Sequence, residues 1–275
     1  AKAPPPERER FPHHLIDILD PDEPYTAADF QKAAAELIRA IAARGRLPAI
    51  VGGTALYIES VVYDYRFPGA GADPQIRARW EAAADELGLA ALHRMLAERD
   101  PAAAARIHPN DRKRIVRALE ICEATGGTTA DFRQKREKKS PYRLCMIGLT
   151  MDRRKLYERI DRRVDEMIGQ GLVEEVRALL AKGYDRGLPA MQAIGYKEIA
   201  AYLCGETTLE RAVELLKRNT RRFAKRQLSW FRTMPQIQWV DVTDESKFST
   251  HCERINDIIA TAFPSPDFPF HTPIS

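Results

Sequence analysis

Apolar side chains recur in two patterns along the chain, and each pattern predicts a different kind of element. Between residues 26 and 45 the spacing is helical, at Phe30, Ala34, Leu37, Ile38 and Ile41. Such a stripe is typical of a helix that buries one face. Thr26 with Asp29 gives this helix a weak capping box, and Gly45 closes it.

Short continuous apolar runs form the second pattern, and they predict strands at residues 14–19, 47–51, 142–149 and 237–242. Helical patterns separate these runs, at residues 26–45, 55–62, 152–169, 173–180 and 207–232, and a last amphipathic helix follows them. Strands that alternate with helices predict an α/β fold with a parallel sheet flanked by helices.

The pattern changes between residues 69 and 140, where no apolar run of the strand type occurs. Asp73 followed by Pro74 is an N-cap with proline at the first helical position. Four helical stretches follow, and a charged loop at residues 133–139 leads out of them. The sequence therefore predicts an all-helical insertion domain at 69–140 and a discontinuous α/β core domain at 1–68 and 141–275.

Gly52, Gly53 and Thr54 join the second apolar run to the helix at 55–62. Glycines let the backbone approach a ligand closely, and the N–H groups at a helix start point outward. Thr54 can cap the helix or offer its hydroxyl group to a substrate. An ordinary tight turn capped by threonine explains the same residues, and this stretch alone favours that explanation.

Composition excludes some classes of protein. The 275 residues are 44% hydrophobic and 30% charged, as expected for a globular chain, and no apolar run approaches the length of a membrane helix. The four cysteines, Cys122, Cys145, Cys204 and Cys252, fit no zinc spacing and indicate a reducing cytoplasm. The pattern predicts no metal site built from these residues.

The net charge of +4 is mild, but three stretches concentrate basic residues. Lys113, Arg114 and Arg117 share a predicted helix face, and Arg163 lies one turn from Arg159. The third stretch, residues 217–232, places its cations on one broad face with aromatic residues among them: Arg218, Arg221, Arg222, Lys225 and Arg232, with Phe223, Trp230 and Phe231.

Cations interleaved with aromatic side chains are typical of surfaces that neutralise phosphates and stack bases. A solvated helix face is the usual alternative, but residues 217–232 contain no acidic residue. The residues themselves therefore favour a polyanion-binding α/β protein with a helical insertion, and they do not specify a reaction.

Short motifs identify a family. They are Ala1-Lys2, PHHLID at 12–17, YTAADF at 25–30, VGGTALY at 51–57, ADP at 72–74 with Arg77, RIHPND at 106–111, RALE at 117–120, IGY at 194–196, and AKRQ with WFR at 224–232. In this order, over nearly the whole chain, the sequence resembles the bacterial tRNA dimethylallyltransferase (tRNA isopentenyltransferase) family.

The resemblance implies a reaction and a fold. The family transfers a dimethylallyl group from dimethylallyl diphosphate to N6 of adenosine 37, in tRNAs that read codons beginning with U, and releases diphosphate. Its fold is like that of the P-loop kinases, and the diphosphate and the adenine meet in a channel. Mg²⁺ assists the diphosphate. We expect a cytoplasmic monomer that binds the anticodon stem-loop and no membrane.

The resemblance also implies roles for residues. Thr54 would contact tRNA at the channel and Arg163 would hold the diphosphate, so both are candidate catalytic residues, and Gly52 and Gly53 would form the substrate turn. The residues expected to contact tRNA are Arg77, Lys113, Arg114, Ile115, Val116, Arg117, Gln192, Ala193, Ile194, Gly195, Tyr196, Lys197, Lys225, Arg226, Gln227, Leu228, Ser229, Trp230, Phe231 and Arg232.

One part of the family pattern is not in this sequence. The family's phosphate loop, G-x-x-x-x-G-K-[ST], and an Asp-Ser motif whose aspartate would be the base lie upstream of the matching motifs. We expect the protein to contain them, because that part would carry the first strand of the sheet. Two other functions stay open: a P-loop small-molecule kinase, which needs no tRNA surface, and a tRNA-binding module without activity.

Overall fold

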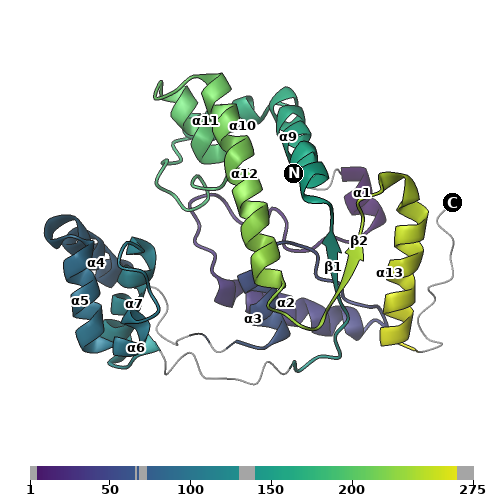
Figure 1. Cartoon of the computed structure of the whole chain (residues 1–275), viewed down its shortest axis with the longest axis horizontal. Coiled ribbons are helices and arrows are strands. Elements are labelled where there is room, and N and C mark those ends of the chain that lie inside the picture. The colour runs from purple at the N-terminus through teal and green to yellow at the C-terminus, as the bar shows by residue number, and fades with distance from the viewer. Residues whose placement is uncertain (1–4, 66, 68–72, 130–139, 265–275) are drawn as a thin grey trace. The chain divides into compact units, whose positions relative to one another are not determined.

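The computed structural model describes residues 5–65, 67, 73–129 and 140–264, and the chain divides into two compact units (Figure 1). One unit, called the core unit here, comprises Ala1–Val62 and Tyr142–Ser275. The other, called the helical unit, comprises Tyr63–Pro141. The charged loop predicted at 133–139 lies outside the described residues.

The core unit contains the two described strands and most of the helices. Its elements are α1 (Pro5–Arg10), α2 (Ala27–Ala42), α3 (Ala55–Val62), β1 (Met146–Thr150), α9 (Arg153–Gly169), α10 (Leu172–Ala181), α11 (Tyr196–Leu203), α12 (Leu209–Phe231), β2 (Ile237–Asp241), the 3₁₀ helix η1 (Glu245–Lys247) and α13 (Phe248–Ala262).

Strands β1 and β2 pair in parallel, with Met146 opposite Ile237 and Thr150 opposite Asp241. The connection between them runs through α9, α10, α11 and α12, and α13 packs against β2. A Cβ atom on Gly148 would lie 2.7 Å from the ring of Trp239, so glycine at this position lets the two strands' side chains pack closely. The parallel pair with its helices confirms the predicted α/β class.

Two predicted strands are wrong. Residues 14–19 cannot form a strand because Leu15 and Asp17 adopt the left-handed conformation, with φ values of 60° and 56°. Residues 47–51 are irregular, and Val51 is 95% exposed. An apolar run forms a buried strand only where a neighbouring strand pairs with it, and among the described residues neither run has such a partner.

The core of the larger unit lies between α9, α10, α11 and α12. Buried side chains from all four helices meet there, among them Val164, Val176, Ile199 and Leu216. Charged groups flank the contact between α9 and α12, where Lys217 pairs with Asp165 at 2.6 Å and Arg221 pairs with Asp161. Helix α12 is therefore fixed against α9 by apolar packing and by two ion pairs one turn apart.

Helix caps follow the sequence closely. The predicted capping box at the start of α2 is confirmed, because Thr26 and Asp29 each accept the other's backbone N–H group. The helix predicted from residue 207 begins at Leu209, and Thr208, rather than Thr207, caps it by accepting the N–H of Arg211. Two adjacent threonines offer the same side chain, and the helix start selects between them.

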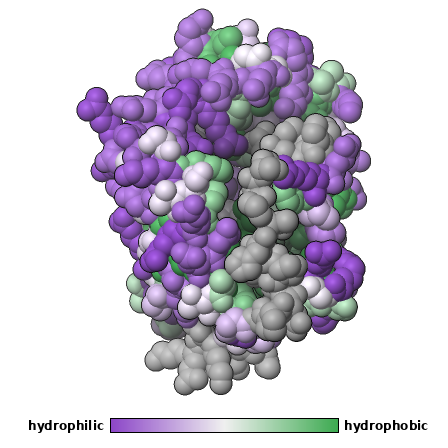
Figure 2. Space-filling view, turned by 90° about the vertical axis from the view of Figure 1, so that its right-hand side faces the viewer, coloured by the Kyte–Doolittle hydropathy of each residue, from purple (hydrophilic) through white to green (hydrophobic). Residues whose placement is uncertain are grey.

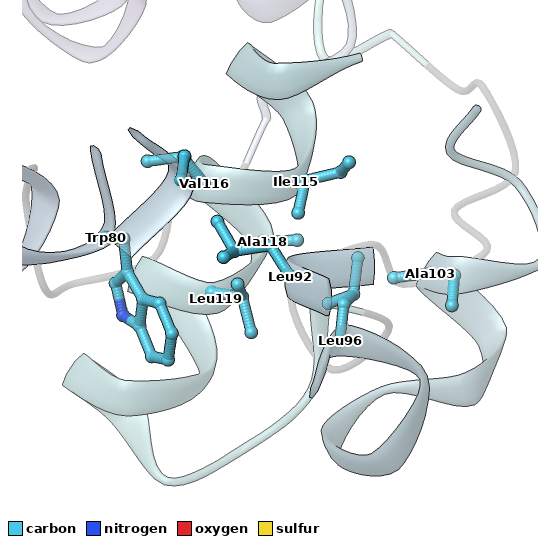
Figure 3. Packing of buried hydrophobic residues seen from close by; sticks show 10 residues of the cluster. Trp80, Leu92, Leu96, Ala103, Ile115, Val116, Ala118 and Leu119 are labelled. Atoms are coloured by element: carbon cyan, nitrogen blue, oxygen red, sulfur yellow. The ribbon is translucent and has the colours of Figure 1, made fainter. Parts of the chain in front are cut away.

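The helical unit consists of α4 (Pro74–Leu87), α5 (Leu89–Arg99), α6 (Pro101–Ala104) and α7 (Arg112–Thr125) in its described part. Asp73 caps α4 as predicted, accepting the N–H groups of Gln75 and Ile76. Trp80 of α4, Leu92 and Leu96 of α5, and Ile115 and Leu119 of α7 point toward one another in a common core (Figure 3). This unit thus has its own apolar core.

Hydrophilic residues cover most of the described surface in one view of the molecule, and hydrophobic residues form scattered patches there (Figure 2). Within the described part of the chain, no helix combines the length and the apolar character that crossing a membrane requires.

A buried carboxylate, that of Asp100, joins α5, α6 and the segment after α7. Asp100 is 1% exposed and accepts the N–H of Ala103 at 2.8 Å, the N–H of Thr129 at 2.8 Å and the hydroxyl of Thr129 at 2.6 Å. Burial acts to raise the pKa of Asp100, but the hydrogen bonds from Thr129 and Ala103 outweigh it, so the pKa lies below its ordinary value.

We predict that Asp100→Asn lowers the free energy of unfolding of the helical unit by about 2 kcal/mol, because a charged acceptor of three hydrogen bonds is lost. The folded-state pKa is depressed, so this contribution is complete above the ordinary pKa of 3.8 and is lost as the pH falls below it. Urea unfolding of both proteins at pH 7 and pH 3 measures the difference.

The matched control is Glu98→Gln, which removes an exposed carboxylate from the last turns of α5. It should leave the unfolding free energy within about 0.5 kcal/mol of the wild type. An Asp100→Asn protein as stable as this control at pH 7 would show that the hydrogen bonds contribute nothing.

Candidate functional site

The turn at residues 52–54 is held in place by helix α12. The side-chain amide of Gln227 donates to the backbone carbonyl of Gly53 at 2.9 Å, although the two residues are 174 positions apart. Thr54 ends the turn at the start of α3, where its carbonyl accepts the N–H groups of Tyr57 and Ile58 at 3.0 and 3.1 Å. The exposed Thr54 hydroxyl makes no hydrogen bond among the described residues, so it is available to a ligand.

Aromatic stacking fixes α3, which carries this turn, to α2. The ring of Tyr57 stacks on that of Phe30 with centroids 4.6 Å apart, and Tyr25 approaches Tyr57 edge-on at 6.5 Å. Because these contacts immobilise the first turn of α3, they also fix the position of Thr54 at its N-terminal end.

The exposed side of α12 is basic. At 100° per residue, Arg218, Arg222, Lys225 and Arg232 lie within about 80° of one another around the helix. All four are exposed, and within the described part of the chain none has an ion-pair partner. The structure thus brings together the cations that the sequence predicted for this face, and it leaves their charge unneutralised.

Arg221 is the exception to the predicted face, because its guanidinium group pairs with Asp161 of α9. It lies on the flank of α12 that packs against α9, so its charge is neutralised and its role is in the packing of the core unit. Contrary to the prediction from the sequence, Arg221 therefore does not belong to the unpaired basic face with Lys225.

Aromatic side chains lie on another side of α12, at least about 80° around the helix from each of the four cations of the basic face. Phe223 is 37% exposed and Trp230 is 42% exposed, and the guanidinium group of Arg226 lies over the Phe223 ring at 5.9 Å. Phe223, Gln227 and Trp230 follow each other at intervals of four and three residues, so they form one strip along α12. This strip runs past the 52–54 turn, because Gln227 contacts Gly53. Leu228 and Phe231 are partly buried, and Ser229 is exposed.

Arg163 lies on α9 next to the buried Val164 and is exposed. The ion pair that would make it an ordinary surface arginine, with Asp161 or Glu166, does not form among the described residues, since Asp161 is taken by Arg221. Arg163 is therefore a free cation on the helix that follows β1.

A cavity of about 380 Å³ lies between α11, α12 and the loop that precedes α11. Its polar lining comes from Arg186, Gln192, Lys197, Glu198, Arg218 and Asn219. The segment 192–197 therefore meets the basic face of α12 at Arg218. Cationic and amide groups around a concave surface can accommodate an anion such as a phosphate group.

Within 192–197 the side chains point in different directions. Gln192 donates to the carbonyl of Arg186 at 2.7 Å, and Gln192 and Ala193 are exposed. Ile194 and Tyr196 instead pack against the core of the unit, and Gly195 is buried. The Tyr196 hydroxyl donates to Glu175, and burial together with this hydrogen bond raises the pKa of Tyr196.

Glu198 holds the segment 192–197 in place through hydrogen bonds. Its side chain is buried and accepts the N–H of Gly195 at 2.8 Å and the side-chain amide of Asn219 at 2.7 Å. One carboxylate therefore ties the loop before α11 to α12, and it also lies 3.8 Å from the Lys197 ammonium group.

In the helical unit, a fully buried carboxylate holds two of the predicted ligand-binding cations. Glu120 accepts from Arg77 at 2.8 Å and pairs with Arg117 at 2.9 Å, and it also accepts the N–H of Asp73 at 2.9 Å. The side chains of Arg77 and Arg117 remain 44% and 35% exposed. Two arginines on one carboxylate leave a net positive charge at the surface, in a fixed geometry.

The other predicted residues of α7 divide between surface and core. Lys113 is exposed without an ion-pair partner among the described residues, and the exposed Arg114 lies 3.4 Å from Asp111. Ile115 and Val116 are 0% and 2% exposed and belong to the apolar core. These two side chains cannot reach a surface ligand, so their part is to position the cations beside them.

Sequence reasoning missed the buried carboxylates and the amide contact. Glu120 lies one turn after Val116 on the apolar face of α7, a pattern that indicates a paired acid in a core. Glu198 occupies the third position of α11 after Gly195, where a carboxylate commonly accepts the cap's N–H group. No local pattern could reveal the contact between Gln227 and Gly53.

The described residues hold no cluster of three or more histidine, cysteine, aspartate or glutamate side chains that could bind a metal ion. Cys122, Cys145, Cys204 and Cys252 are all free thiols.

A family model described as IPP transferase matches residues 1–234. A tRNA dimethylallyltransferase of Geobacillus thermodenitrificans is 49% identical over 263 residues, which cover 94% of this chain and 82% of the relative. A tRNA dimethylallyltransferase of Heliobacterium modesticaldum is 52% identical over 259 residues, which cover 93% of this chain and 80% of the relative.

Solved structures are also similar. The crystal structure of a full-length tRNA isopentenylpyrophosphate transferase from Bacillus halodurans has a TM-score of 0.68 and 46% identity, and the match covers 95% of this chain and 81% of that one. A eukaryotic dimethylallyltransferase acting on tRNA has a TM-score of 0.76 and 27% identity, and the match covers 94% of this chain and 68% of that one.

We predict that Glu120→Ala destabilises the helical unit by about 3 kcal/mol, because it leaves two arginines and the Asp73 N–H group without their buried acceptor. Thermal or urea unfolding of the purified chain measures the loss. Glu86→Ala, which removes an exposed carboxylate from α4, serves as the control and should be close to neutral. Equal stability of the two variants would contradict the assigned role of Glu120.

Proposed function

The chain belongs to the IPP transferase family and transfers a dimethylallyl group to tRNA, and we propose that the donor is dimethylallyl diphosphate and the acceptor N6 of adenosine 37. The tRNAs concerned are those that read codons beginning with U, and the second product is diphosphate. These finer points rest on the motifs of the sequence and on the chemistry of the described surface.

The observation that supports a tRNA substrate best is the exposed side of α12. Among the described residues, Arg218, Arg222, Lys225 and Arg232 have no ion-pair partner there, and Phe223 and Trp230 are exposed on another side of the same helix. Such a surface binds the phosphates of an RNA backbone and offers rings for stacking an unpaired base. A small-molecule kinase has no use for it, so the kinase alternative leaves the largest basic feature of the core unit unexplained.

The reaction breaks the bond between the allylic carbon and a diphosphate oxygen and forms a bond between that carbon and N6. Negative charge develops on the leaving diphosphate, and positive charge develops on the allylic carbon. A cation that contacts the diphosphate stabilises the first of these charges. Orientation of the amine contributes more than activation, and the amine loses a proton to a base, for which the family resemblance implies an aspartate upstream of the matching motifs.

Two residues of this chain are assigned to these tasks. Arg163 is a free guanidinium group on α9 and contacts the diphosphate, where it offers several N–H donors to the oxygens. The unpartnered hydroxyl group of Thr54 lies on the turn at the start of α3 and orients the adenine.

Mg²⁺ is expected with the diphosphate because of the family resemblance. The described residues do not by themselves form a metal site, since they contain no suitable cluster of ligands. Magnesium often takes most of its ligands from substrate phosphates and water. A cytoplasmic monomer remains the expected form.

The function is tested by incubating the purified full chain with tRNA and radiolabelled dimethylallyl diphosphate. Label recovered in a modified adenosine after nuclease digestion supports the proposal, and position 37 is identified by digestion of a single tRNA. If the tRNA binds the protein but acquires no label, the protein is a binding module. Phosphate transfer from a nucleoside triphosphate to a small alcohol would indicate a kinase.

We predict that Arg163→Ala lowers kcat at least about tenfold, which corresponds to about 1.4 kcal/mol of lost transition-state stabilisation. The arginine matters most as charge builds on the leaving group, so the rate at saturating substrates is the decisive measurement. Arg162→Ala removes the neighbouring exposed arginine, about 100° away around α9, and should leave the rate unchanged. Equal rates for both variants would remove Arg163 from the reaction.

We also predict that Lys225→Ala weakens binding to all tRNAs alike, because phosphate contacts carry no sequence information. The slope of the logarithm of affinity against the logarithm of salt concentration should flatten by about 0.7 to 0.9. Arg221→Ala should change this slope less, since Asp161 already neutralises Arg221. Filter binding over a salt series measures both variants.

A Lys225→Ala protein with the wild-type salt slope would contradict a phosphate contact at this position. The tRNA surface would then have to be sought on α7 of the helical unit, between Lys113 and Arg117.

A further inference from the structure

Gln227 and Gly53 make a contact in which each residue limits the other. The side-chain amide nitrogen of Gln227 lies 2.9 Å from the Gly53 carbonyl oxygen, and it donates a hydrogen bond to it. A Cβ atom on Gly53 would overlap this nitrogen and would lie 3.1 Å from the amide carbon. The glutamine therefore occupies the space that any larger residue at position 53 would need.

The need for glycine at position 53 does not come from its backbone conformation. The φ angle of Gly53 is not among the positive values of the described glycines, so an L-residue is sterically allowed there as far as φ is concerned. Gly52, by contrast, has nothing within 4 Å of its would-be Cβ atom. Of the two glycines in the turn, only Gly53 lies so close to α12 that a Cβ atom would overlap a side chain, and that side chain is Gln227.

Gln227 points away from the basic face. It lies about 200° around α12 from Lys225, since two residues separate them by two steps of about 100°. Gln227 is half-buried, whereas Lys225 and Arg226, which directly precede it, are exposed. One of the two N–H donors of this amide is used within the protein, on the Gly53 carbonyl.

We propose that Gln227 is a positioning residue that fixes the 52–54 turn, and with it the Thr54 hydroxyl group, against the helix that carries the basic face. This inference deepens the proposed function and rests on it, because it concerns how the adenine is oriented for transfer. The same helix segment then binds the RNA backbone through its outer side and sets the substrate turn through its inner side.

The first variant is Gln227→Glu, which keeps the shape of the side chain and replaces the N–H donor by an oxygen that repels the Gly53 carbonyl. The proposal predicts a fall in kcat of about tenfold with the KM for tRNA and the salt slope unchanged. A raised KM for tRNA with unchanged kcat would mean that Gln227 contacts tRNA directly, and it would overturn the proposal. Gln238→Glu, which makes the same chemical change at an exposed position of β2, should match the wild type.

A double-mutant cycle supplies a readout that neither a tRNA contact nor a general structural role would move. Gly53→Ala should lower kcat on its own, because the added methyl group displaces the amide and breaks the hydrogen bond. In the Gln227→Ala background the methyl group has room, so the added change should cost less than about twofold. If the fold-losses in kcat of the two single variants multiply in the double variant, the two residues act independently and the proposal is wrong.

Thermal unfolding of the four proteins of the cycle separates this inference from the proposed function. If the wild-type chain transfers no dimethylallyl group to tRNA, the proposed function fails. In that case the contact is still supported if the double variant's unfolding temperature is lowered no more than that of the more affected single variant. Additive shifts of the unfolding temperature overturn it.

Discussion

Helix α12, 23 residues long, has neighbours on three sides and solvent on the fourth. Leu216 and Ala212 pack into the core with α9 and α11, Lys217 and Arg221 pair with acids of α9, and Gln227 holds the Gly53 carbonyl. A helix fixed on three sides cannot rotate without breaking one of these contacts, so its fourth side presents the cations in a constant orientation. Everything assigned to the site of the core unit depends on this restraint.

Buried carboxylates do similar work in several other places. Glu120 fixes Arg77 and Arg117, Glu198 fixes the loop before α11, and Asp100 fixes the end of the described part of the helical unit. A buried carboxylate is costly unless its oxygens are saturated with donors, and each of these three accepts at least two hydrogen bonds. The donors come from different segments of the chain. The carboxylate is satisfied only when these segments lie in one arrangement, so it fixes how loops and helices meet more tightly than apolar packing alone does.

Most of the helices were predictable from the sequence to within a few residues, but α1 and α11 were not predicted, and neither were the pairing partners of the strands. A helix satisfies its own backbone, so the stripe of α2 and its cap at Thr26 are local signals. The apolar run at 47–51 carries no information on whether another strand lies beside it, and here the described chain leaves it irregular. The basic face of α12 was visible in the sequence, but the pairing of Arg221 with Asp161, across 60 residues, and of Gln227 with Gly53, across 174, depends on the tertiary fold.

The positions of the paired and unpaired cations on α12 also affect where a polyanion is attracted to the core unit. Lys217 and Arg221, toward the middle of the helix, are paired with acids of α9, whereas Arg222, Lys225 and Arg232 have no ion-pair partner in the part of the chain that the structure describes. With a net charge of only +4, the whole chain exerts a weak long-range attraction, and screening confines each charge to roughly 8–10 Å. The local field is then dominated by the free cations in the C-terminal half of α12. That half includes Gln227, so these cations lie on the same helix segment that contacts the turn bearing Thr54.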